Sequence, residues 1–203
     1  MDNSAISDLF SLLSKLMDIH GENSFKSRTY SIAAYNIDQL TTPLSNMSPA
    51  EILMQKGMQG SVGQKVIEIL ETGKLSALAE LINNTPPGVI DMLQVKGLGP
   101  KKIHVIWKEM EIESLGELLY ACFENRLTRY KGFGAKTQQN IQEGIEYYMQ
   151  NQGHYLYAEM EILFPQIDGY LKKVVGADKV AVSGAYRQQQ LTMDELVFEV
   201  QAT

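Results

Sequence analysis

Two glycine-rich turns hold the residues of this 203-residue chain that are best suited to bind a ligand. The segment VKGLGPKKIHVI spans residues 95–106, and YKGFGAKTQQNI at residues 130–141 repeats its order of an apolar residue, Lys, Gly, an apolar residue, Gly, any residue and Lys. An apolar pattern typical of a helix follows each turn. The repeat therefore predicts two helix-hairpin-helix turns with one shared task.

Anion binding is the chemistry that such turns favour. Glycine lets the backbone adopt a positive φ, and its missing side chain lets another molecule come close. The first N–H groups of the following helix have no intrahelical partner, and the helix dipole adds roughly half a positive charge there. A phosphodiester fits such a site whatever base it carries, so we expect the turns to bind DNA without reading its sequence.

The predicted DNA-binding residues are the paired glycines and neighbouring lysines of the two turns, namely Gly97, Gly99, Lys101, Lys102, Gly132, Gly134 and Lys136. A weaker third copy, QKGMQGSVGQKV at residues 55–66, adds Gly57 to this set. It has Gln59 and Ser61 where the other copies have glycine and lysine. The alternative for each copy is a tight, glycine-capped connection that binds nothing.

The local charge also favours a nucleic-acid surface. The whole chain has a net charge of −6, but residues 96–136 contain eight Lys or Arg and five Glu, a local charge of +3. A basic segment within an acidic chain indicates a binding face better than the total charge does.

Composition argues against several other classes of protein. Cys122 is the only cysteine, which excludes an intrachain disulfide and indicates a cytoplasmic protein, here expected to associate with the nucleoid. The three scattered histidines do not have the spacing of zinc ligands. Since no apolar run reaches the ~18 residues of a membrane helix, we expect no membrane partner.

Helical periodicity dominates the first three quarters of the chain. It predicts helices over residues 4–17, 23–40, 48–55 and 62–71, with Ser4 and Ser48 as N-caps and with Phe25 and Tyr30 available for packing. The turn NNTPPGV at 83–89 marks a boundary, and helices are expected near 88–94, 100–110, 114–122 and 135–150.

Runs rich in β-forming residues appear only near the end of the chain. After a helix from about 155 to 173 come KVAVSG (179–184) and ELVFEV (195–200). Two strands do not form an independently stable sheet, so they either pair with other elements here or begin a larger α/β domain, which we prefer. The predicted fold is mainly α, a helical bundle with helix-hairpin-helix motifs and then a small α/β fragment.

The motifs and their order resemble the N-terminal part of the bacterial family X DNA polymerases, relatives of polymerase beta. HGENSFKSRTYSIAA (20–34) is similar to a segment of the lyase-type domain of the family, TPPGVIDMLQVKGLGPKK (85–102) to the beginning of its fingers domain, and RLTRYKGFGAKTQQNI (126–141) to the next hairpin. The resemblance implies a lyase-like domain at 1–83, a fingers-like domain at 84–152 and a truncated palm start at 153–203. It also implies gapped or nicked duplex DNA as the partner, and further C-terminal domains.

The resemblance assigns chemistry to the first of these domains. Lys65 aligns with the lyase nucleophile of the family, which attacks the sugar aldehyde at a cleaved abasic site and forms a Schiff base. Lys26 matches a lysine that holds the 5′-phosphate, and Tyr30 matches a nearby tyrosine. The alternative for Lys65 is a structural one, with its stem on the core and its ammonium in water.

The palm motif departs from the family pattern. Family members have a strand with two aspartates that bind magnesium, whereas VSGAYRQQQLTMDELVFEV (182–200) places Glu195 and Val197 at those positions, with Asp194 expected on the other face of the strand. Because Mg²⁺ needs two carboxylates there, Glu195 is a degenerate remnant and nucleotide transfer is not expected. No cofactor is expected, except a monovalent cation at a hairpin, or Mg²⁺ in a complete palm.

Three functions follow. The preferred one is a non-sequence-specific DNA-binding region of a family X polymerase-like protein of base excision repair. The second is an active 5′-deoxyribose-phosphate lyase that uses Lys65, and the third is a protein-interaction scaffold.

Overall fold

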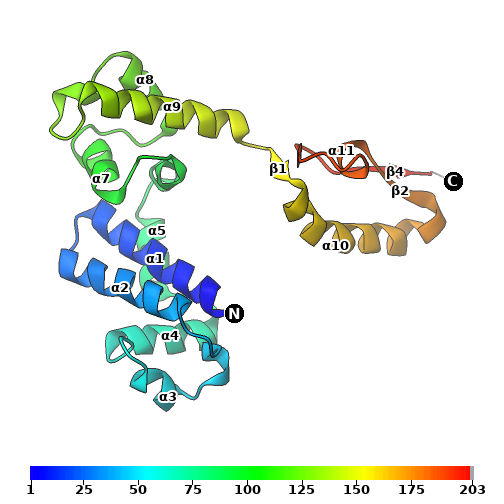
Figure 1. The fold of residues 1–203 in the computed structure, drawn as a ribbon, viewed down its shortest axis with the longest axis horizontal. Coiled ribbons are helices and arrows are strands. Elements are labelled where there is room, and N and C mark those ends of the chain that lie inside the picture. The colour runs from blue at the N-terminus through cyan, green and yellow to red at the C-terminus, as the bar shows by residue number, and fades with distance from the viewer. Residues whose placement is uncertain (202–203) are drawn as a thin grey trace. The chain divides into compact units, whose positions relative to one another are not determined.

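The computed structural model describes residues 1–201, which form two compact units, Met1–Glu146 and a second that starts at Tyr147. Eleven α-helices account for most of the described residues, and the strands follow Asn151 (Figure 1). The predicted mainly α fold is confirmed. The predicted domain boundaries near residues 84 and 153 stay predictions.

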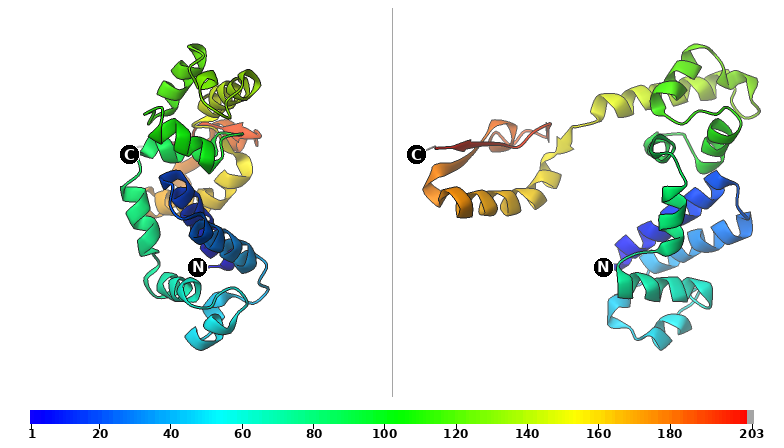
Figure 2. Two further views of the ribbon diagram at one scale, coloured as in Figure 1. Left: turned by 90° about the vertical axis from the view of Figure 1, so that its left-hand side faces the viewer. Right: turned by 180° about the vertical axis from the view of Figure 1, so that it is seen from behind.

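The first unit begins with an antiparallel pair of helices, α1 (Asn3–His20) and α2 (Ser24–Asp38), which lie side by side (Figure 2). Their apolar faces meet, and the rings of Phe10 and Tyr30 are 5.9 Å apart. The N-cap predicted at Ser4 was wrong. Asp2, two residues earlier, has the carboxylate that accepts the N–H of Ala5 at 2.8 Å, so the helix starts sooner.

The expected packing of Phe25 was also wrong, because its side chain is 83% exposed. The buried face of α2 follows the helical spacing Ser27, Tyr30, Ala34 and Ile37. Phe25 is two residues from Ser27, which places it on the opposite side of the helix.

Three further helices complete the N-terminal half of this unit: α3 (Pro49–Met54), α4 (Ser61–Thr72) and α5 (Ser76–Asn83). The N-cap predicted at Ser48 is confirmed and forms a capping box with Glu51. Helix α4 ends, as expected, at the "TG" pair, where Gly73 has a φ of 70°.

The second half contains α6 (Pro87–Asp91), α7 (Pro100–Lys108), α8 (Leu115–Phe123) and α9 (Ala135–Asn151). Helix α7 packs on α1, where His104 Nδ1 lies 2.9 Å from the carbonyl oxygen of Ile19 and the ring of Trp107 meets that of His20 edge-on at 5.0 Å. These contacts fix the glycine turn at Gly97–Gly99 relative to α1 and α2.

The second unit contains β1 (Tyr155–Leu156), α10 (Tyr157–Val175), β2 (Val180–Ser183), α11 (Gly184–Arg187), β3 (Thr192–Met193) and β4 (Val197–Val200). Strands β2 and β4 pair antiparallel with Val180 opposite Val200, and β1 pairs with β3. Tyr186 stacks on Phe164 at 4.4 Å in a small core with Met160 and Met193. The two predicted strands thus pair with each other, and the preferred interpretation that they begin a larger α/β domain stays a prediction.

Within residues 1–201, no helix has both the length and the apolar character that a bilayer crossing requires.

Candidate nucleic-acid interface

All three glycine turns have the same backbone geometry. Gly57, Gly97 and Gly132 have φ values of 79°, 91° and 92°. In each turn the next, buried residue donates its N–H to a carbonyl three positions earlier at 3.1 Å: Met58 to Gln55, Leu98 to Val95 and Phe133 to Tyr130. This is a β-turn with glycine at the third position, where a positive φ is needed. The repeat in the sequence is therefore a repeat in the structure.

The turn at Gly97 and Gly99, the second along the chain, leaves its amides without hydrogen-bond partners. The N–H groups of Gly97, Gly99 and Lys101 donate no hydrogen bond to any described residue. A Cβ built on Gly97 or Gly99 would meet no atom within 4 Å. Because Gly99 is also the N-cap of α7, the open amides lie at the positive end of that helix.

The turn at Gly132 and Gly134, the third along the chain, is open in the same way. The N–H groups of Gly132, Gly134 and Lys136 have no acceptor within the described part of the chain, and a Cβ on either glycine would meet nothing within 4 Å. Helix α9 begins directly after Gly134. Both predicted hairpins thus have room for an oxyanion at their amides.

The turn at Gly57, the first along the chain, is closed by its own side chains. The N–H of Gly57 donates to Gln59 Oε1 at 3.1 Å, while Gln59 Nε2 donates to the carbonyl of Gln55 at 2.9 Å. A Cβ on Gly57 would lie 2.5 Å from Asn36 Nδ2. Gln59, which replaces the second glycine, therefore accepts the N–H that a phosphate would need. In this conformation Gly57 is not available to a phosphate.

The lysines of the two open turns differ in their surroundings. Lys102 Nζ donates to the carbonyl of Gly97 at 3.2 Å, so it also holds the turn together. Lys101 and Lys136 are exposed. The only ion pair among residues 1–201 joins Lys172 to Asp168, so the lysines at the turns have no carboxylate partner. Their charge is available to an external anion.

The residues that the resemblance assigned to lyase chemistry lie together. Lys26 and Tyr30 from α2 and Lys65 from α4 line one cavity of about 310 Å³. Lys65 Nζ lies 5.9 Å from the centre of the Tyr30 ring, and Glu22 and Glu80 add two carboxylates to the cavity wall. The structure thus gathers residues that are up to 39 positions apart in the sequence.

His20 lines the same cavity and was missed as a site residue. Its Nε2 lies 2.8 Å from the hydroxyl oxygen of Thr85, whose single proton is donated to the carbonyl of Leu81 at 2.6 Å. The Thr85 oxygen must therefore accept from His20 Nε2–H, which leaves Nδ1 with the lone pair. The segment HGENSFK contains His20, but Thr85 comes from a remote segment, so no local pattern in the sequence indicates this contact.

The palm remnant does not form a metal site. Glu195 precedes β4, which begins at Val197, so neither Glu195 nor Asp194 lies on the strand as predicted. The expectation that Asp194 points to the other face of a strand therefore does not apply. The described residues contain no group of three His, Cys, Asp or Glu side chains that could hold a metal ion. The residues present do not fit the magnesium of a complete palm.

We predict that His20 makes stability depend on pH between pH 7.5 and 5.5. Burial, with a smaller contribution from Lys108, lowers the pKa of His20 below its usual 6.5. The unfolded chain therefore binds this proton first as the pH falls, and stability is lost through that range. Hydrogen bonds from Ser48 and Ser76 hold the pKa values of Glu51 and Glu68 below 4.5, so these two groups titrate at lower pH.

Thermal unfolding followed by circular dichroism should show a smaller decrease in Tm between these pH values for His20→Gln than for the wild type. His154→Gln, which changes an exposed histidine in the other unit, should behave like the wild type. Equal decreases for all three proteins would contradict this assignment.

Comparison with known proteins agrees with this geometry. Residues 1–75 match the helix-hairpin-helix domain family, and residues 89–146 match the SAM-like helix-hairpin-helix tandem family. Over 137 residues the chain is 28% identical to the DNA polymerase/3'-5' exonuclease PolX of Bacillus subtilis (strain 168), a match that covers 68% of this chain and 24% of that protein. The chain therefore spans about a quarter of the relative it matches. With the order of the motifs, these matches confirm the predicted resemblance: the chain is related to the N-terminal region of the family X DNA polymerases.

Proposed function

We propose that this chain binds the phosphate backbone of DNA without sequence preference, as a region of a family X polymerase-like repair protein. The observation that carries the proposal is the pair of turns at Gly97–Gly99 and Gly132–Gly134, which combine unpaired amides, open space and unpaired lysines. Hydrogen bonds from such amides to a charged phosphate contribute about 1.5–3 kcal/mol each. They contact no base edge, so binding does not depend on sequence.

The two open turns are also fixed relative to each other. Gly144 of α9 packs so closely on the second turn that a Cβ there would lie 3.0 Å from the carbonyl oxygen of Lys96. The helix that starts at the third turn thus crosses the second turn directly. A rigid pair of phosphate sites favours one regular DNA geometry over a flexible chain, because little entropy is lost on binding.

Gapped or nicked duplex is the proposed form of this DNA, and the nucleoid is the proposed location. A gap offers a 5′-phosphate in addition to the continuous backbone. Lys26 and Lys65 line the 310 Å³ cavity and can pair with such a terminal phosphate, although Glu22 and Glu80 on the same lining balance their formal charge.

We predict that Gly99→Ala combined with Gly134→Ala weakens binding to gapped duplex by about 100-fold, about 10-fold per turn, because each methyl group enters the space that a phosphate would use. Neither glycine has a positive φ, so the variant should fold normally. Fluorescence anisotropy should show the same loss for two unrelated DNA sequences. The salt dependence of log K should also become shallower, by about 0.9 for each phosphate that the variant no longer engages.

Gly116→Ala is the matched control, since Gly116 lies on α8 and a Cβ there also meets no atom within 4 Å. It should bind like the wild type. Unchanged gapped-duplex affinity in the double variant would show that the hairpins do not hold the DNA.

A second function, 5′-deoxyribose-phosphate lyase activity, is proposed because one cavity contains Lys26, Tyr30 and Lys65. The Lys65 amine would attack C1′ of the sugar aldehyde and lose water to form a Schiff base. Removal of a C2′ proton would then break the C3′–O bond and release the 5′-phosphorylated strand. Hydrolysis would return the amine.

We predict that borohydride traps the wild-type chain on an incised abasic duplex, and that Lys65→Ala reduces the adduct at least tenfold. Lys74→Ala, an exposed lysine that does not line the cavity, should form as much adduct as the wild type. An adduct that persists without Lys65, or the absence of one in the wild type, would rule out this second function.

A further inference from the structure

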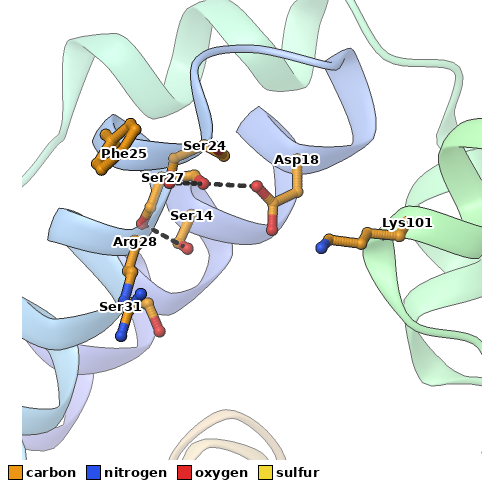
Figure 3. A pocket seen from close by; sticks show the side chains of 8 residues that line it. All are labelled: Ser14, Asp18, Ser24, Phe25, Ser27, Arg28, Ser31 and Lys101. Atoms are coloured by element: carbon orange, nitrogen blue, oxygen red, sulfur yellow. Dashed lines mark hydrogen bonds between the residues drawn. The ribbon is translucent and has the colours of Figure 1, made fainter.

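A polar pocket of about 420 Å³ lies beside the second glycine turn and is separate from the cavity at Lys65. Helices α1, α2 and α7 form its wall, and it is lined by Ser14, Asp18, Ser24, Phe25, Ser27, Arg28, Ser31 and Lys101 (Figure 3). Most of these side chains are polar. Two of them are cations, which can pair with an anion.

Two cations in this pocket have no internal partner. Neither Arg28 nor Lys101 has a carboxylate within 4 Å, since the single ion pair of residues 1–201 lies in the other unit. In Figure 3, Lys101 extends from α7 toward Asp18 on α1, and Arg28 and Ser31 of α2 lie on the opposite side of the pocket. Both cations are exposed, so a charged ligand can reach them from solvent.

Some of the other polar groups in the pocket already form hydrogen bonds within the chain. The Asp18 carboxylate accepts the hydroxyl of Ser27 at 2.5 Å, and the Ser14 hydroxyl donates to the carbonyl of Ser27 at 2.8 Å (Figure 3). The Ser31 hydroxyl has no hydrogen-bond partner among the described residues. The lining has two positive charges and one negative charge, so its formal charge is +1.

The position of Lys101 links the pocket to the second turn. Its backbone N–H is one of the open amides at the start of α7, while its side chain lines the pocket. A phosphate bound at Gly97–Gly99 would therefore lie beside a residue that lines the pocket. The docking of α7 on α1 through His104 and Ile19 places Lys101 in one pocket with Arg28, although the two lie 73 positions apart in the sequence.

We propose that this pocket is a backbone phosphate subsite in which Arg28 and Lys101 hold one phosphate of the strand bound at the second hairpin. The proposal rests on the proposed DNA binding and adds a contact on α2 that no hairpin motif predicts. The planar guanidinium of Arg28 can donate two parallel hydrogen bonds to a phosphate, the Lys101 ammonium adds a compact charge, and the Ser31 hydroxyl can donate a third contact. The volume leaves room for the attached sugar.

A double-mutant cycle tests whether the two side chains share a phosphate. Arg28→Gln and Lys101→Gln should each weaken gapped-duplex binding about 10-fold, measured by fluorescence anisotropy. The double variant should lose about 10- to 20-fold, because removing one ligand leaves the other poorly placed. Lys74→Gln removes one positive charge outside the pocket and should lose less than twofold.

Two results would overturn the subsite. A loss near 100-fold in the double variant would place Arg28 and Lys101 on separate phosphates, and unchanged affinity in Arg28→Gln would remove Arg28 from the interface. Either result rejects the subsite alone if the wild type still binds DNA and the Gly99→Ala/Gly134→Ala variant binds it about 100-fold more weakly. DNA binding at the hairpins is then still supported. Failure of the wild type to bind DNA would reject the proposed function and the subsite together.

Discussion

The binding surface depends on one constraint, which is that each hairpin is anchored by a buried apolar residue while its glycines stay outside. Leu98 and Phe133 are buried and close a β-turn through their own N–H groups. This turn forces Gly97 and Gly132 to positive φ and directs the following amides away from the protein. The buried apolar residue thus stabilises the turn, and the glycines let a phosphate reach its amides. This explains why the two residue types alternate in the motif.

Packing between α1 and α7 connects the two halves of the first unit. His20 contacts Trp107 from α7 and also lines the cavity that contains Lys65, while Asp18, two residues earlier, lines the pocket shared with Lys101. One end of α1 therefore contributes to both polar pockets. This arrangement gives a physical reason for proposing that the hairpin and the lyase-like part contact one DNA molecule.

The sequence predicted most of the helices, the capping at Ser48 and the two open hairpins, because these depend on local spacing and on glycine at fixed positions. It missed the short helices α5 and α11. It did not predict that Gln59 would cap its own turn, since a side-chain rotamer decides that contact. His20 was missed as a site residue because its neighbour Thr85 comes from a remote segment. The pocket that Arg28 shares with Lys101 was missed for the same reason. Asp194 and Glu195 were misplaced because the length of a short strand depends on its pairing partner.

The most direct test of the central claim is a titration of the ¹⁵N-labelled chain with gapped duplex DNA, followed by ¹H–¹⁵N NMR. We expect the largest amide shift changes at Gly97, Gly99, Lys101, Gly132, Gly134 and Lys136, with little change at Gly57, whose N–H is already paired. Saturating DNA that leaves the open amides of both turns unshifted would contradict phosphate binding at the hairpins.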